Sequence, residues 1–379
     1  MDLICFCHIR WNFVYQRPQH LLNRFAKNSR VFVVEEPIYD SDSDYYEINQ
    51  PDEQVNLWVV VFHVSNNTLE DRMNLTLKAL VDSFMFSNKI KQYILWFYSP
   101  MALQYAEHLS PSLTIYDCMD ELSAFKNPPA GIKEMEARLL NLSDLVFTGG
   151  HSLYKAKKHL HENIYSFPSS IDKSHFESAR VFKKDPDDQV LIPHPRFGFY
   201  GVIDERFDIL LVDEIASLRP DWHFVFIGPV IKINPQDLPV HENIHYLGSK
   251  SYAELPSYLS GWDIAILPFA LNESTKFISP TKTPEYLAGG KPVISTSITD
   301  VVMPYGKQGL VQIADSAQEF VQAAEKIFND KNKKEWIQKV DDFLSNISWN
   351  KTWHKMSLLI DEALVKKTSI KKNKSKIYV

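Results

Sequence analysis

Short apolar runs alternate with helical patterns along almost the whole chain. Runs such as 3–9, 30–35 and 93–98 are predicted to be buried strands, and segments such as 19–27 and 152–160 between them have helical spacing. This alternation is typical of an α/β fold with doubly wound parallel sheets. Because no Gly-x-Gly-x-x-Gly follows any predicted strand, the sequence disfavours a nicotinamide or flavin enzyme.

The alternation is interrupted once, near the middle of the chain. Residues 180–195 are charged and aperiodic, and they contain Pro193 and Pro195. A chain of 379 residues is long enough for two domains. We therefore predict one Rossmann-like domain over residues 1–185 and a second over residues 190–346, with only helical patterns near the C-terminus.

Charge and cysteine content narrow the class of protein. The net charge of −6 argues against nucleic-acid binding as the main role. Cys5, Cys7 and Cys118 lie in strand-like runs, and we predict buried free thiols in a reducing compartment rather than metal ligands. The longest apolar run, 57–62, is too short to span a bilayer, and no secretory signal is evident. We expect a cytoplasmic protein, either free or peripheral to the membrane.

The C-terminal tail, residues 367–379, is strongly basic. Six lysines and no acidic residue occupy the last fourteen positions of the chain. We predict that this tail has no fixed structure. Its charge can serve solubility alone, or it can bind anionic lipid at the inner face of the membrane.

The segment 279–294 has the pattern of an anion-binding helix start. We predict that Ser279 caps a helix and that Pro280 occupies its first position. Lys282 adds a positive charge beside the free amides of that turn, and Glu285 lies one turn further along the same face. Amides and a lysine suit a diphosphate, and a glutamate suits ribose hydroxyls. The alternative is an ordinary capped helix with a surface Lys282–Glu285 pair.

Several segments, taken together, resemble the retaining GT-B glycosyltransferases of family four. In the second half they are residues 198–206, 226–229, 246–248, 267–269 and 279–294, in that order. Two segments of the first half, 7–20 and 116–121, resemble a bacterial subgroup of this family that builds envelope polysaccharides. The resemblance implies that an N-terminal acceptor domain and a C-terminal donor domain face a cleft. It also implies that residues 347–366 form a final helix that crosses back onto the first domain.

The resemblance assigns roles to residues of the second half. Glu285 matches the glutamate that binds the nucleotide ribose, and Arg206 matches a basic residue that binds the diphosphate together with Lys282. Phe277 replaces the glutamate that usually contacts the donor sugar, and the nearby Asn272 and Glu273 are candidate substitutes. The predicted donor-binding residues are Gly201, Ile203, Asp204, Tyr252, Asn272, Glu273, Ser279, Thr281 and Glu285.

In the first half, Asp120 is the best candidate to orient a donor or acceptor hydroxyl, although it can equally cap the helix that follows. The histidine that the family has at this strand end is absent, and Met119-Asp120 stands in its place. His151, at another strand end, has a structural alternative because it is a lone histidine. The predicted catalytic residues are Asp120, Arg206 and Lys282, and the predicted acceptor or phosphate contacts are Arg10, Arg17, His20 and His151.

Together these expectations describe a hexosyltransferase-type glycosyltransferase. It would move a sugar from a nucleotide-diphosphate donor, UDP in particular, to a glycan or lipid-linked acceptor with retention, in cell-envelope or exopolysaccharide synthesis. The leaving phosphate takes the acceptor proton in such a mechanism, so no enzymic nucleophile is needed. No metal-ligand cluster is evident, and we expect no metal and no cofactor beyond the nucleotide-sugar co-substrate. Two alternatives stay open: a GT-B nucleotide-sugar epimerase, and a nucleotide-sugar-binding protein that has lost transfer.

Overall fold

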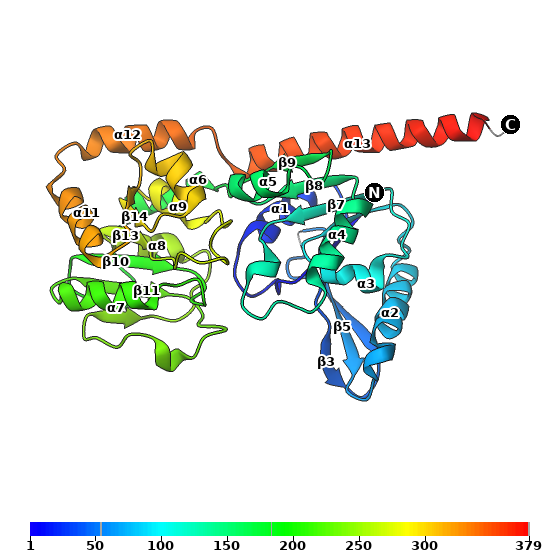
Figure 1. Cartoon of the computed structure of the whole chain (residues 1–379), viewed down its shortest axis with the longest axis horizontal. Coiled ribbons are helices and arrows are strands. Elements are labelled where there is room, and N and C mark those ends of the chain that lie inside the picture. Colours follow the sequence, from blue (N-terminus) through cyan, green and yellow to red (C-terminus); the bar gives the residue numbers. More distant parts are fainter. Residues whose placement is uncertain (54, 183, 378–379) are drawn as a thin grey trace.

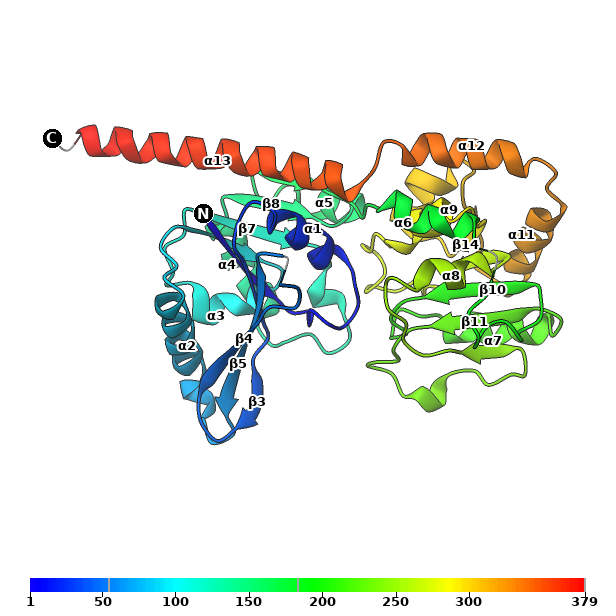
Figure 2. The ribbon, with the colours of Figure 1, turned by 180° about the vertical axis from the view of Figure 1, so that it is seen from behind.

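The computed structural model describes residues 1–53, 55–182 and 184–377. Its ribbon divides into two bodies, each built around one largely parallel sheet with helices packed on it (Figure 1). Figure 2 shows the same two bodies side by side from behind, joined above by the C-terminal helices. The α/β fold with two parallel sheets is confirmed.

The first sheet has nine strands in the order β3-β5-β2-β1-β6-β7-β8-β9, with β4 paired to β5. Its pairings are parallel except that of β4 with β5. The strands are β1 (Asp2–Cys7), β2 (Val31–Glu35), β3 (Ile38–Ser41), β4 (Tyr45–Asn49), β5 (Leu57–Ser65), β6 (Tyr93–Phe97), β7 (Leu113–Cys118), β8 (Leu145–Thr148) and β9 (Ile164–Ser166). Its helices are α1 (Arg17–Phe25), α2 (Met73–Ser87), α3 (Leu103–Ala106), α4 (Ile132–Leu142) and α5 (His151–Lys157), with the short turns η1 (Glu70–Arg72), η2 (Pro100–Ala102) and η3 (Leu122–Ala124).

Both faces of the first sheet are buried, because successive side chains of a strand point to opposite faces. In β1, Ile4 and Phe6 enter one core, whereas Leu3, Cys5 and Cys7 enter the other. The three cysteines are buried and free, as predicted. Burial on both faces explains why these strands read as continuous apolar runs rather than as alternating patterns.

The second sheet has six parallel strands in the order β12-β11-β10-β13-β14-β15. The chain runs outward from β10 to β12 and then returns to the other side of β10, so the strand order reverses there. In open α/β sheets, ligands bind at the carboxyl ends of the strands beside such a reversal. The strands are β10 (Arg196–Tyr200), β11 (His223–Ile227), β12 (Ile244–Tyr246), β13 (Ile264–Leu267), β14 (Val293–Ser295) and β15 (Gln312–Ile313). The helices are α7 (Ile209–Leu218), α8 (Leu255–Ser260), α9 (Lys282–Ala288), α10 (Thr299–Val301), α11 (Ala317–Asn329) and α12 (Lys333–Leu344), with η5 (Pro235–Asp237) and η6 (Val302–Gly306).

The two bodies are connected twice. The first connection carries α6 (Lys173–Glu177) and η4 (Ser178–Arg180), and the second leads into α13 (Trp349–Ile377). As expected, α13 crosses back: Trp349, Met356 and Ile360 are buried in a core of the first domain.

The C-terminal helix is longer than predicted. The expected helix ends at residue 366, but α13 continues to Ile377 and projects past the body of the first domain (Figure 1). The tail predicted to lack fixed structure is therefore helical as far as Ile377, and residues 378–379 lie outside the described residues. Lysine has a high helix propensity, and neither glycine nor proline follows Trp349 to stop the helix. Within the described ranges, no helix combines the length and the apolar character needed to cross a membrane.

Candidate active site

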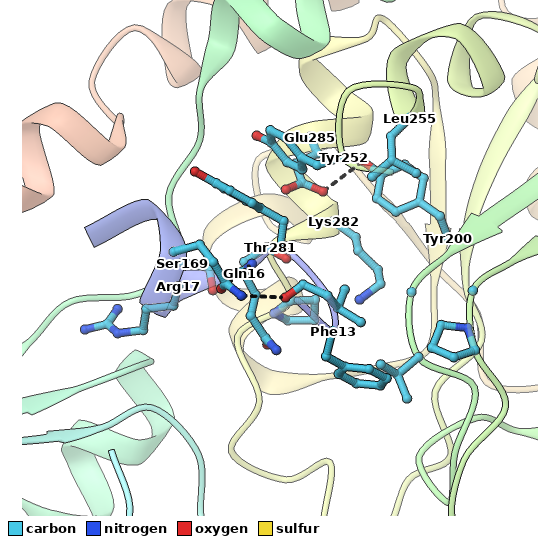
Figure 3. Close-up of a pocket in the computed structure, with 18 of the residues that line it drawn as sticks. Phe13, Gln16, Arg17, Ser169, Tyr200, Tyr252, Leu255, Thr281, Lys282 and Glu285 are labelled. Carbon is cyan, nitrogen blue, oxygen red and sulfur yellow. Dashed lines mark hydrogen bonds between the residues drawn. The ribbon is translucent and has the colours of Figure 1, made fainter. Parts of the chain in front are cut away.

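A cavity of about 420 Å³ lies between the two domains, at the carboxyl ends of their strands. Residues of both domains line it, and Figure 3 shows labelled side chains of the two domains on its walls. The first domain contributes mainly the loop between β1 and α1, the Met119–Asp120 pair after β7, Gly149 and Ser169. The second domain contributes Tyr200–Val202, Arg206, 227–229, 249–252, Leu255, Phe269, 278–282 and Glu285.

Lys282, the first residue of α9, lines this cavity (Figure 3), and its side chain passes beside Gly201. A Cβ atom at position 201 would lie 2.0 Å from Lys282 Cε, and Gly201 has a φ of 138°, which side chains disfavour. Burial, assisted by the nearby Arg206 charge, lowers the pKa of Lys282. Glycine at 201 therefore provides the space in which the ammonium group lies.

Glu285 lies one turn further along α9 and is only 5% exposed. The Tyr200 hydroxyl donates a hydrogen bond of 2.8 Å to Oε2 of Glu285 (Figure 3). Burial raises the pKa of Glu285. In the described part of the chain, Glu285 forms no ion pair within 4.0 Å, so the alternative of a surface pair with Lys282 is not what the structure shows. A lysine and a glutamate that share a cavity without pairing are available to a ligand.

Arg206 also lines the cavity, and its position depends on Asp204. The guanidinium donates from Nε (2.9 Å) and Nη2 (2.6 Å) to the Asp204 carboxylate, which is buried. Asp204, predicted to bind the donor, is therefore paired with Arg206. Ile203 is likewise a core residue, 1% exposed, whose backbone bridges to Val230. Neither residue lines the cavity.

Asp120 lies on the opposite wall, just after β7. Burial raises the pKa of its carboxyl group, and the charges of Arg206 and Arg17 oppose that rise. Among the described residues, the Asp120 carboxylate accepts no hydrogen bond, and the following turn η3 has Glu121 at its N-cap with no side-chain cap. Asp120 therefore does not cap the turn that follows it, and the alternative role as a helix cap is wrong.

The start of α9 differs from the prediction. The helix begins at Lys282 with Thr281 as N-cap, and no side chain caps it. Ser279 instead contacts Ser169 near the end of the first domain: Ser169 N donates to Ser279 Oγ (3.3 Å) and Ser169 Oγ donates to Ser279 O (2.5 Å). Ser279 and Thr281 still line the cavity, but the serine links the two domains rather than capping the helix.

Tyr252 lines the cavity as well, and its ring is part of an aromatic cluster between the domains. It stacks on Tyr15 of the first domain at 4.5 Å between centroids and on His175 at 4.4 Å. His20 approaches the Tyr252 ring edge-on and stacks on Trp349 at 4.6 Å. His20, predicted as an acceptor or phosphate contact, is therefore a buried packing residue outside the cavity lining.

The remaining predicted first-domain contacts have partners within the protein. Arg10 pairs with Glu35 at 2.9 Å and does not line the cavity. Arg17 lines it, but its guanidinium pairs with the fully buried Asp117 at 2.8 Å and donates to Phe167 O. His151 does not line it either: its backbone N–H donates to Asp300 Oδ2 across the domain interface, and its ring contacts Ser166.

The residues proposed to replace the missing donor-sugar glutamate are not in the cavity lining. The Asn272 side chain accepts from the amides of Ser274 and Thr275 and so shapes its own turn. The Glu273 side chain is 77% exposed beside Lys276. Phe277 packs against the core of the first domain, so this position serves the contact between domains.

The sequence predicted that the turn after the first strand opens into the cleft, but it did not identify the aromatic side chains of the loop between β1 and α1 as a wall of the site. Trp11, Phe13 and Tyr15 all line the cavity, and their alternate spacing was the available signal. Two buried side chains hold the loop: Gln19 Nε2 donates to Trp11 O and Val14 O, and Glu35 Oε1 accepts from Trp11 N. These anchors come from α1 and β2, so the loop geometry depends on tertiary contacts.

Comparison with known proteins relates the second domain, which forms one wall of this site, to a known family. A family model described as Glycosyl transferases group 1 matches residues 194–330. Over 279 residues, 25% are identical to TuaH of Bacillus subtilis (strain 168), which is named as a candidate glycosyltransferase of teichuronic acid biosynthesis. That match covers 68% of each protein.

Solved structures of low sequence identity share the fold over nearly the whole chain. Sucrose-phosphate synthase from Thermosynechococcus elongatus has a TM-score of 0.71 at 12% identity, covering 97% of this chain and 100% of that one. Anabaena Alr3699/HepE, solved in complex with UDP and glucose, has a TM-score of 0.65 at 15% identity, covering 95% and 99%. An E. coli trehalose-6-phosphate protein bound with UDP-2-fluoro glucose has a TM-score of 0.68 at 10% identity, covering 96% and 99%. Residues 194–330 therefore form a domain of the Glycosyl transferases group 1 type, and the chain as a whole has the GT-B fold.

Proposed function

We propose that this enzyme transfers a sugar from a UDP-sugar to a glycan or lipid-linked acceptor with retention, in the synthesis of an envelope or extracellular polysaccharide. The observation that carries the proposal is the convergence of Lys282, Arg206 and Glu285 on one interdomain cavity. Two cations and one carboxylate are the groups that a diphosphate and a ribose require. The cavity also lies at the strand-order reversal where α/β sheets bind ligands.

In this proposal the second domain holds the leaving group. Lys282 and Arg206 contact the diphosphate, and their charges stabilise the negative charge that grows on it as the glycosidic bond breaks. Glu285, fixed by the Tyr200 hydroxyl, accepts hydrogen bonds from the ribose. These two positive charges let the enzyme act without a bound metal. Gly201 and Thr281 complete this wall of the cavity.

The first domain orients the reacting groups. Asp120 accepts a hydrogen bond from a donor or acceptor hydroxyl, because its carboxylate has no protein partner among the described residues. For retention, the acceptor oxygen attacks the face of the anomeric carbon that the diphosphate is leaving. The departing phosphate oxygen takes the acceptor proton, so the new C–O bond forms as the old one breaks.

The relatives support the choice of donor and pathway. HepE was solved with UDP and glucose, and the E. coli protein with a UDP-sugar analogue. TuaH is named for teichuronic acid biosynthesis. An envelope acceptor places the enzyme at the inner face of the membrane, and the lysines at residues 366–376 provide charge complementary to anionic lipid.

The proposal is tested by thermal-shift and calorimetric titration with UDP-, GDP- and dTDP-sugars, because a ligand that binds only the native state raises its melting temperature. The best donor is then incubated with acceptor glycans in EDTA, and NMR assigns the anomeric configuration of donor and product. Transfer with retention is expected. Release of an epimer with free UDP would indicate an epimerase, and binding with no turnover would indicate a protein that only binds nucleotide sugar. Inversion would contradict the proposed mechanism.

A further inference from the structure

Phe125 of the first domain contacts two cations of the second domain. Its ring centroid lies 5.2 Å from the Arg206 guanidinium carbon and 5.1 Å from Lys232 Nζ. Phe125 follows η3 in the segment between β7 and α4, whereas Arg206 and Lys232 follow β10 and β11 of the second sheet. The ring is half-buried and lies outside the cavity lining. It is therefore an interdomain contact directed at the cationic side of the site.

A neighbouring hydrogen bond fixes the same contact. The backbone N–H of Lys126 donates to Glu205 Oε1 at 3.2 Å, so the residues after Phe125 and before Arg206 are tied together. Asp204 holds Nε and Nη2 of Arg206 from within the second domain. Among the described residues, Nη1 of Arg206 makes no hydrogen bond. One domain thus fixes the guanidinium by hydrogen bonds, and the other covers it with an aromatic face.

We propose that Phe125 is a positioning residue that makes the diphosphate site depend on closure of the two domains. This inference rests on the proposed role of Arg206 in binding the donor diphosphate. A cation over an aromatic face is attracted by the ring quadrupole, and the attraction strengthens as water is excluded. With the domains together, the ring limits the orientations of the guanidinium and reduces its hydration. With the domains apart, Arg206 keeps only Asp204 and is free to hydrate.

The two cations at the Phe125 ring also act on Asp120, the carboxylate of the first-domain wall. Asp120, on the first-domain wall, is influenced electrostatically by Arg206 and Lys232, the two cations at the Phe125 ring. Closure therefore brings the orienting carboxylate and the aromatic ring to Arg206 in a single movement. Nucleoside binding alone involves no phosphate, so it does not depend on Phe125.

The test is Phe125→Leu, which keeps an apolar side chain but removes the aromatic face. Affinity for UDP is measured by calorimetry and affinity for uridine by ligand NMR titration. We expect UDP affinity to fall about three- to tenfold, with uridine affinity unchanged, and Phe125→Tyr to retain UDP affinity. In an Arg206→Ala background, Phe125→Leu is expected to cause no further loss of UDP affinity, because the guanidinium through which the ring acts on the diphosphate is already absent.

Phe277→Leu is the matched control. Phe277 forms another contact between the domains, and it lies outside the cavity lining. Like Phe125 it has a cation at its ring, because Lys276 Nζ lies 5.5 Å from the ring centroid. A similar loss of UDP affinity in Phe277→Leu, equal losses for UDP and uridine, or additive effects with Arg206→Ala would each overturn the inference while leaving the proposed function intact. If Arg206→Ala itself leaves UDP affinity unchanged, the proposed role of Arg206 fails, and this inference fails with it.

Discussion

In the first domain, Arg17 and Asp117 form a buried ion pair at 2.8 Å, whereas in the second domain Lys282 and Glu285 share the cavity without an ion pair. The side chains of Arg17 and Asp117 are 5% and 0% exposed, and Arg17 also donates to Phe167 O. The pair thus ties α1, β7 and the chain after β9 to one another. Its charges are already satisfied, so it offers little to a ligand although Arg17 lines the cavity.

The buried charged groups of the second domain, Lys282 and Glu285, lack such an ion pair. Burial raises the pKa of Glu285 and lowers that of Lys282, so the protein disfavours the charged form of both groups. Buried charged groups that lack an ion-pair partner are unfavourable for stability, and they cluster at functional sites. The difference teaches that a charged residue in a cleft must be judged by its partners. Arg17 serves the fold, and Lys282 and Glu285 serve the ligand.

The largest expected effect is on stability, in Arg17→Ala. Removing the arginine leaves Asp117 buried without its cation, which destabilises a protein by about 3–5 kcal/mol. Urea unfolding followed by fluorescence measures the loss. Arg30→Ala is the control, because Arg30 forms an exposed pair with Asp2, for which a loss of about 0–1 kcal/mol is expected. If both variants lose the same small amount, the Arg17–Asp117 pair does not stabilise the fold.

Lys282→Met is expected to weaken UDP binding without lowering the stability of the fold. Stability stays the same or rises, because the substitution removes a charge whose pKa the folded protein lowers. UDP affinity falls by roughly 1.5–3 kcal/mol, or about ten- to hundredfold, because a charged hydrogen bond to the diphosphate is lost. Calorimetry and urea unfolding on the same samples separate the two effects. Lys276→Met, which alters a half-exposed lysine outside the cavity lining, should change neither. A destabilised Lys282→Met protein with full UDP affinity would erase the contrast between the two domains.

The smallest expected effect is on the pH dependence of binding. A ribose hydroxyl bonds best to an ionised carboxylate, so affinity for a UDP-sugar should rise as pH increases through the raised pKa of Glu285. It should fall again as Lys282, with its lowered pKa, loses its proton. A UDP-sugar has no phosphate group that titrates near neutral pH, so the profile reports the protein.

The Glu285→Gln variant tests which group produces the acidic side of that profile. It should lose the rise at low pH and keep the fall at high pH, measured by calorimetry between about pH 5 and pH 9. Stability provides a second reading. The folded protein holds a proton on Glu285 above the ordinary glutamate pKa, so the free energy of unfolding falls as pH rises through the interval between the two pKa values. That decline should also disappear in Glu285→Gln. An acidic side that survives the substitution would assign it to another group.

Much of the architecture follows from local patterns in the sequence. Apolar runs predict strands because each is buried on both faces of its sheet, and their alternation with helices requires parallel connections. Lys282 and Glu285 could be located from spacing alone, since residues three apart on a helix share a face. Arg206 was placed by the family resemblance, because it matches the basic residue that follows the first strand of the second domain, which is β10.

The partners of these residues could not be found in the same way. Arg17 and Asp117 are separated by 100 positions, and Tyr15 stacks on Tyr252 across the domain interface. The same holds for Ser279, which contacts Ser169 instead of capping α9, and for Phe125, whose cations belong to the other domain. Local spacing determines which face of an element a side chain occupies. Only the packing of the two domains decides whether that side chain meets an internal partner or remains free for a ligand, because those contacts join residues that the sequence keeps far apart.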